Sequence, residues 1–204
     1  LNFGTEIRFL KSYSFLKQQS SVSIGVRAYR GKTGRHQLGT GSTGNDYDIT
    51  VTPVSSSKTW GRDLEFGTDN IAFFAENLFK IGKRLQVTPG FRFERIDATA
   101  SGYINTSASG TIENKKQQRT IFLAGIGSEF KVSEKSALYA NLSQAYRPVT
   151  FSELTPSATT DVIDPNLKDA SGYNLDFGYR GNLFKHFNFD IGGFWLHYNN
   201  RIGT

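Results

Sequence analysis

The first stretch whose residue types and spacing could perform chemistry is the glycine-rich segment QLGTGSTGNDYD, residues 37–48. Gly39, Gly41 and Gly44 have the G-x-G-x-x-G spacing of a dinucleotide-binding loop. That spacing binds a pyrophosphate only where a buried strand precedes it and a helix follows. The residues before it are polar and turn-forming, and those after it have no apolar period of 3.6. We therefore interpret the segment as a flexible loop and not as a nucleotide site.

Catalytic and metal-binding patterns are equally weak in the rest of the chain. No G-x-S-x-G or H-E-x-x-H motif occurs, and His36, His186 and His197 are too far apart in sequence for a helical i, i+4 pair. The chain has no Cys, which excludes disulfides and thiolate metal sites. We therefore expect no enzyme activity, no protein-bound metal and no other cofactor.

The formal net charge of +6 favours an anionic partner, which could be nucleic acid, lipid headgroups or an acidic small ligand. Nucleic-acid binding requires a concentrated basic surface, whereas the charges here are interleaved with acidic residues. The run ENKKQQR, residues 113–119, is interpreted as the solvated base of a loop. No nucleic-acid partner is expected.

Elements that could position functional side chains are recognised by alternation of apolar and polar residues with period two, which is typical of strands. In LQVTPGFRFERI, Val87, Phe91 and Phe93 take one face while Arg92 and Glu94 take the other. The same pattern predicts eight strands within residues 3–9, 21–29, 71–79, 85–96, 119–130, 137–147, 173–183 and 187–195.

The predicted connections alternate in length. Short turns are expected near residues 15–17, 79–80, 130–131 and 184–185, and long connections over residues 31–69, 97–116 and 148–171. Short turns at one end, long loops at the other and strands of about 10 residues are typical of an antiparallel transmembrane β-barrel of the outer membrane. The sequence therefore predicts an all-β fold of this kind.

A soluble β-sandwich with its apolar faces packed together is the alternative architecture. The charges on the second face favour the barrel, because they stay solvated in a water-filled or plugged lumen. These are Glu6, Arg8, Arg27, Glu76, Arg92, Glu94, Asp176, Arg180 and Asp190. Aromatic residues near the predicted strand ends also suit the two interfacial girdles of a barrel, although a sandwich could carry them too.

Two stretches resemble the barrel of TonB-dependent outer-membrane receptors. DPNLKDA, residues 164–170, is similar to the family's NPNLKPE-like segment, with Asp169 and Ala170 in place of the usual Pro and Glu. NIAFFAENLFKIGKRLQVTPGFRFERI resembles a hairpin of the same barrels. The resemblance covers essentially the whole chain and is strongest over 70–96 and 139–181. Within the family, the basic residues before GTGSTG make the chain most similar to the ferric-citrate type.

The resemblance implies a 22-stranded barrel around an N-terminal plug, in the outer membrane of a Gram-negative bacterium. Eight strands would be about a third of that wall, so residues 1–204 are expected to form a partial barrel without the plug domain. Coupling to the TonB–ExbB–ExbD complex would use segments missing from this sequence. The alternative is a complete eight-stranded barrel with a structural or enzymatic role.

The family resemblance also implies an anionic ligand, a ferric chelate such as iron dicitrate, whose iron arrives already chelated. Arg offers carboxylates a planar fork and Gln adds a neutral donor, so Arg35 and Gln37 are the first candidates and His36 the second. Thr150, Ser152 and Asn166 are weaker polar candidates, and Lys32 and Arg62 could contribute charge. The alternative is that these basic residues contact lipopolysaccharide phosphates or keep a loop soluble. Which chelate is bound stays open.

Overall fold

The computed structural model describes residues 1–38, 60–104, 111–150, 167–184 and 186–200, which form eight strands and no helix. Accordingly, no helix in these ranges has the length and hydropathy needed to cross a bilayer. The strands are β1 (Asn2–Phe15), β2 (Gln18–Leu38), β3 (Trp60–Ile81), β4 (Leu85–Ile104), β5 (Thr111–Ser133), β6 (Ser136–Arg147), β7 (Ala170–Leu183) and β8 (Phe187–Asn199). Each of the eight predicted strands lies within one of these elements.

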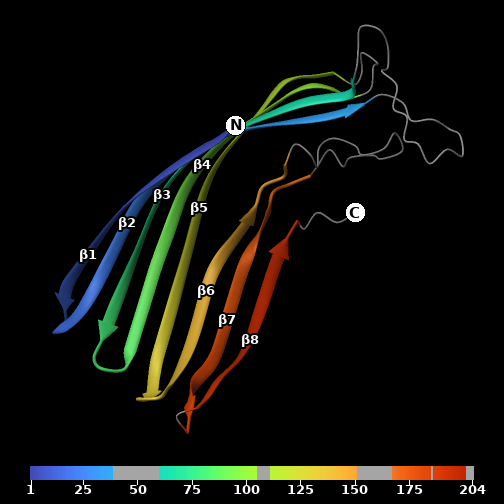
Figure 1. Cartoon of the computed structure of the whole chain (residues 1–204). Coiled ribbons are helices and arrows are strands. Elements are labelled where there is room, and N and C mark those ends of the chain that lie inside the picture. Colours follow the sequence, from blue (N-terminus) through green and yellow to red (C-terminus); the bar gives the residue numbers. More distant parts are fainter. Residues whose placement is uncertain (39–59, 105–110, 151–166, 185, 201–204) are drawn as a thin grey trace, which may run out of the picture. The chain divides into compact units, whose positions relative to one another are not determined.

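All eight strands belong to one antiparallel sheet in which every strand pairs with its neighbours in sequence, in the order β1 to β8 (Figure 1). The prediction of an all-β, antiparallel fold is therefore confirmed. No second sheet occurs among the described residues, so the β-sandwich alternative is wrong. β1 and β8 are the two edges of the sheet, and the sheet is open in the part of the chain described, unlike a closed eight-stranded barrel.

The two faces of the sheet differ in chemistry, as the register of β6, β7 and β8 shows. Leu138 lies opposite Tyr179, which in turn lies opposite Ile191. On the other face, Asn141 lies opposite Asp176, and Arg180 opposite Asp190. We call these the apolar face and the polar face. Large side chains of the apolar face stay uncovered by protein, with Ile191 72% exposed, as expected of a surface that contacts lipid.

Four short turns join the strands in pairs, as predicted. They comprise residues 16–17, 82–84, 134–135 and 184–186. Leu16 and Lys17 both have positive φ, 50° and 60°, which is the backbone of a two-residue type I′ hairpin without the usual Asn-Gly. Gly82 supplies the positive φ, 64°, in the second turn. The aromatic-then-lysine pattern therefore located the reversals to within a few residues.

Two of the three long connections are shorter than predicted, because the strands on either side continue further. β2 extends to Leu38 and β3 begins at Trp60, so residues 31–38 and 60–69 are strand and not loop. The run 113–119 likewise lies in β5 and not at the base of a loop. Residues 31–38 have Leu38 as their only large apolar residue, so hydrophobic alternation is lost in this part of β2, while cross-strand charge pairs such as Arg30–Asp69 remain. The third connection agrees, with β6 ending at Arg147.

The chain divides into two compact units, each with parts of several strands. The first comprises residues 1–5, 27–71 and 95–120, which are the parts of β1 to β5 far from the short turns. The second comprises residues 6–26, 72–94 and 121–204, and it contains all four short turns. A transmembrane β-strand needs about 9–11 residues. Counted from the short turns, such spans fall in the second unit.

Candidate functional site

Arg35, His36 and Gln37 lie near the end of β2 that is far from its short turn, and all three are exposed. Because successive side chains of a strand point to opposite faces, Arg35 and Gln37 share one face while His36 takes the other. The glycines 39, 41 and 44 lie outside the described residues. The three adjacent candidates are therefore divided between two surfaces by the strand that carries them, a consequence of β2 continuing past residue 31.

His36 belongs to a contact with β3 that the sequence analysis did not anticipate. Its Nδ1 lies 2.9 Å from Oδ1 of Asp63, and its ring centroid lies 5.3 Å from that of Trp60. The carboxylate and the indole together fix the imidazole on that side of the hairpin. His36 thus has a structural partner. The sequence did not reveal it, because contacts between residues on two strands can be inferred only once the register is known.

Arg35 and Arg62 form the basic part of the other face. Since His36 meets Asp63, alternation brings Arg35 and Arg62 together on the opposite side of β2 and β3. Arg62 is buried, with 7% of its surface exposed. Burial of the guanidinium lowers the pKa of Arg62, and the charge of Arg35 lowers it further. Arginine stays protonated nonetheless, so two like charges are held close to each other.

The guanidinium of Arg35, with the charge of Arg62 nearby, can bind an anion. Arg35 is exposed and forms no hydrogen bond or ion pair with the described part of the chain. The planar guanidinium of Arg35 offers parallel N–H donors to a carboxylate, and Gln37 adds an amide on the same face. The arrangement therefore fits a small ligand with carboxylate groups.

Arg30 and Asp69 form an exposed ion pair between the same two strands, with Nε 2.5 Å from Oδ1. The hydrogen bond from Arg30 lowers the pKa of the Asp69 carboxyl and raises that of Arg30. Arg30 has the strand parity of His36, and so lies on the face opposite Arg35. Because Arg30 already has a carboxylate partner and lies on the opposite face, its substitution is a suitable control for substitution of Arg35.

Thr150 is exposed and lies in the second unit, just after the end of β6. The other two weak candidates, Ser152 and Asn166, fall outside the described residues. Next to Thr150, the Val149 N–H donates to Oδ1 of Asp169 over 2.8 Å, and the Tyr146 hydroxyl donates to the other carboxylate oxygen. Asp169, one of the two residues that depart from the family-like segment, therefore connects the end of β6 to the start of β7.

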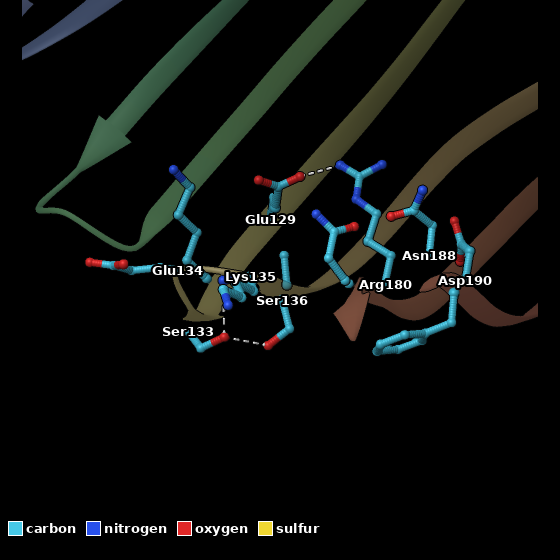
Figure 2. Close-up of a pocket in the computed structure, with 13 residues that line it drawn as sticks. Glu129, Ser133, Glu134, Lys135, Ser136, Arg180, Asn188 and Asp190 are labelled. Atoms are coloured by element: carbon cyan, nitrogen blue, oxygen red, sulfur yellow. Dashed lines mark hydrogen bonds and ion pairs between the residues drawn. The ribbon is translucent and has the colours of Figure 1, made fainter. Parts of the chain in front are cut away.

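Near the short turns the polar face carries a second cluster. Arg180 donates to Glu129 and lies over the ring of Tyr139, 5.4 Å from its centroid. The Tyr139 hydroxyl donates to Oδ1 of Asp190 over 2.9 Å. Figure 2 shows Glu129, Arg180 and Asp190 around a depression of about 490 Å³. Alternation predicted the positions of Arg180 and Asp190 on this face, whereas Glu129 and Tyr139 were missed because the two strands before β7 have weak patterns.

None of these groups forms a catalytic or metal-binding constellation. In the described ranges no three His, Cys, Asp or Glu side chains are grouped so that they could hold a metal ion. Of the histidines, His36 meets Asp63, His186 is exposed in a turn, and His197 stacks on Tyr173 with centroids 5.1 Å apart.

Comparison with protein families gives a match over residues 2–204 to the family described as TonB dependent receptor-like, beta-barrel. No curated protein matches significantly. The family comprises receptors and transporters of the outer membrane of Gram-negative bacteria, and not enzymes.

Solved structures with the same fold agree with this match. The ferric citrate transporter FecA in the unliganded form has a TM-score of 0.75 and 18% identity, over 98% of this chain and 28% of its own. The alcaligin outer-membrane receptor FauA from Bordetella pertussis has a TM-score of 0.68 and 11% identity, over 98% and 29%. The Pseudomonas aeruginosa ferripyoverdine receptor, bound to ferripyoverdine, has a TM-score of 0.68 and 16% identity, over 98% and 25%. The chain thus spans less than a third of each.

Proposed function

The chain belongs to the TonB-dependent receptor β-barrel family, and from this membership we propose that it forms part of the wall of an outer-membrane receptor that imports a ferric chelate. Its polar face would line the lumen and its apolar face would contact lipid. Structures of the same fold include receptors for chemically different chelates, so the fold supports the transport class and leaves the ligand to the side chains. Import would require TonB, with ExbB and ExbD, acting through segments outside these residues.

The proposed ligand is a ferric complex with carboxylate groups, of which iron dicitrate is the example. The observation that carries this choice is the exposed guanidinium of Arg35, with Gln37 on the same face and the charge of Arg62 nearby. Carboxylates pair bidentately with the planar fork of a guanidinium group. The iron would be cargo, held by the chelator and not by protein side chains. Thr150, Ser152 and Asn166 remain candidate polar contacts.

The test is ligand binding by the full-length receptor carrying Arg35→Gln. Loss of one charge-assisted hydrogen bond costs about 1.5–3 kcal/mol, which is roughly a 10- to 150-fold rise in Kd for ferric dicitrate. Gln37→Ala should raise Kd by a smaller factor, because the amide is neutral. Arg30→Gln is the matched control, since it removes an arginine from the same strand but from the opposite face. Uptake of radioactive iron by cells should fall in the same order.

An unchanged Kd in Arg35→Gln, or an equal rise in Arg30→Gln, would contradict the carboxylate site. The alternative role for Arg35, contact with lipopolysaccharide phosphates, makes a different prediction. It requires that Arg35→Gln lower the stability of the receptor in lipopolysaccharide-containing membranes while ferric dicitrate still binds with wild-type affinity.

A further inference from the structure

The excess positive charge of the chain is concentrated at its four short turns. The chain has 24 basic and 18 acidic residues. Residues 15–18, 79–85, 130–136 and 183–187 contain seven of the basic residues and one acidic residue, so the remainder of the chain carries 17 of each and is neutral. The whole formal charge of +6 therefore belongs to one end of the hairpins.

The turn cations also differ from the strand cations in their partners. Five strand arginines form ion pairs with carboxylates: Arg8, Arg30, Arg92, Arg95 and Arg180. At the turns, five exposed cations form no ion pair within the described part of the chain: Lys17, Lys83, Arg84, Lys131 and Lys135. We call these five the basic turn row. Its charge is not neutralised by this chain.

The turns that carry the row are adjacent to one another. The Phe15 and Phe79 rings, with centroids 5.2 Å apart, connect the first turn to the second. The Lys131 N–H donates to the Arg84 carbonyl over 2.8 Å, and the Asn182 N–H donates to the Lys135 carbonyl over 2.9 Å. These backbone bonds connect the second turn to the third and the third to the fourth. The cations thus form a continuous line along one edge of the second unit, at the short-turn ends of the strands in Figure 1.

Apolar side chains lie directly beside this line. Phe15, Phe130, Leu183 and Phe187 belong to the apolar face in the last positions of their strands next to the turns, and they are 38%, 43%, 42% and 58% exposed. Aromatic residues at this place form the interfacial girdle of a membrane barrel. The basic turn row consequently lies at the depth of lipid headgroups, with acyl chains on the apolar side of it.

We propose that the basic turn row binds the phosphates of anionic phospholipids, such as phosphatidylglycerol, in the leaflet at the short-turn side of the membrane. Unpaired ammonium and guanidinium groups beside an apolar band are complementary to a phosphate group beside acyl chains. Each such cation is attracted electrostatically to an anionic membrane surface. The girdle favours lipid over an acidic soluble protein, which would not need exposed aromatic residues. This proposal rests on the barrel spanning a membrane and is independent of the chelate.

The experiment compares two triple variants of the full-length receptor, reconstituted in phosphatidylcholine bilayers. Lys17→Gln/Lys83→Gln/Lys135→Gln removes one cation from each of three turns, and Lys115→Gln/Lys116→Gln/Lys168→Gln removes three exposed lysines away from the turns. Electron spin resonance of spin-labelled phosphatidylglycerol, relative to spin-labelled phosphatidylcholine, measures how strongly each variant prefers the anionic lipid at its surface.

We expect the wild type and the second variant to prefer phosphatidylglycerol at low salt, and the turn variant to lose most of that preference. The loss is on the order of 5-fold for each cation that contacts headgroups. High salt should reduce the wild-type preference, because exposed charges are screened. An unchanged preference in the turn variant, or an equal loss in the second variant, would overturn the proposal and favour an acidic soluble partner. Ferric dicitrate affinity, measured in parallel, should be the same in all three proteins.

Discussion

Gly178 allows the polar face to hold Tyr139 flat against the sheet, and its replacement by alanine should therefore destabilise the barrel. A Cβ at position 178 would lie 2.5 Å from the Tyr139 hydroxyl oxygen, 2.6 Å from its Cζ and 2.8 Å from the carbonyl oxygen of Ile191. Contacts below 3.0 Å are not sustained, so either the ring or the backbone of β8 must move. The ring is itself held by Arg180 and Asp190.

The size of the effect follows from these two ways of relieving the clash. A ring that moves away loses its hydrogen bond to the Asp190 carboxylate. A ring that stays forces overpacking strain on β7 and β8, which costs about 1–3 kcal/mol. We therefore expect Gly178→Ala to lower the free energy of unfolding by about 2 kcal/mol.

Urea unfolding of the full-length receptor in lipid, followed by the electrophoretic mobility of the folded barrel and by tryptophan fluorescence, measures this difference at constant m. Gly125→Ala is the matched control, since its Cβ would meet its nearest atoms at 3.4 Å, an ordinary contact. That variant should change stability by less than about 0.5 kcal/mol. Tyr139→Leu in the Gly178→Ala background should recover part of the loss. Equal midpoints for Gly178→Ala and Gly125→Ala would refute the argument from Tyr139.

Two further predictions concern polar contacts between strands. Asp169→Ala should remove the acceptor of the Val149 N–H, in a residue only 4% exposed, at a cost of about 1–3 kcal/mol. Limited trypsin digestion should then cleave faster at Arg147 or Lys168. An unchanged cleavage rate would contradict this prediction. Arg30 holds the pKa of the Asp69 carboxyl below its usual 3.8. The ion pair therefore stabilises the hairpin fully above pH 3.8, and this stabilisation is lost as the pH falls through the lowered pKa of Asp69. The Arg30→Gln variant should therefore lose less stability than the wild type on acidification below about pH 4, as measured by thermal unfolding. Parallel stability profiles against pH would exclude a contribution of the ion pair.

The membrane-spanning parts of the fold were predictable from sequence because most strands there have one mainly apolar face. β7 shows this most clearly: Tyr173, Leu175, Phe177 and Tyr179 alternate with polar or small residues, and all four lie on the apolar face. Turn positions followed from the same signal, since the alternation stops at each aromatic-then-lysine pair. The sequence alternation agrees with the strand faces here because a strand with lipid on one side and water on the other has apolar and polar residues in alternation.

The outer parts of β2 and β3 could not be predicted in this way. Residues 31–38 contain almost no apolar side chains to alternate, and Gly31 and Gly34 favour a loop interpretation by composition alone. What keeps these residues in a ladder is cross-strand pairing, Arg30 with Asp69 and His36 with Asp63, and that requires the register. The same missing register explains why Trp60 and Asp63 were absent from the predicted site.

The misjudged strand boundary also affects how a ligand site is inferred. In a loop, Arg35, His36 and Gln37 could converge on one chelate, and their adjacency in sequence would argue for a joint role. In a strand they cannot, because Arg35 and Gln37 point away from His36. A residue from another strand, Arg62, then replaces His36 as the neighbour of Arg35, and the charge of Arg35 contributes to the lowered pKa of Arg62. Under the proposed function, a carboxylate ligand would therefore contact Arg35 and Gln37 on one face of β2, and not His36 on the other.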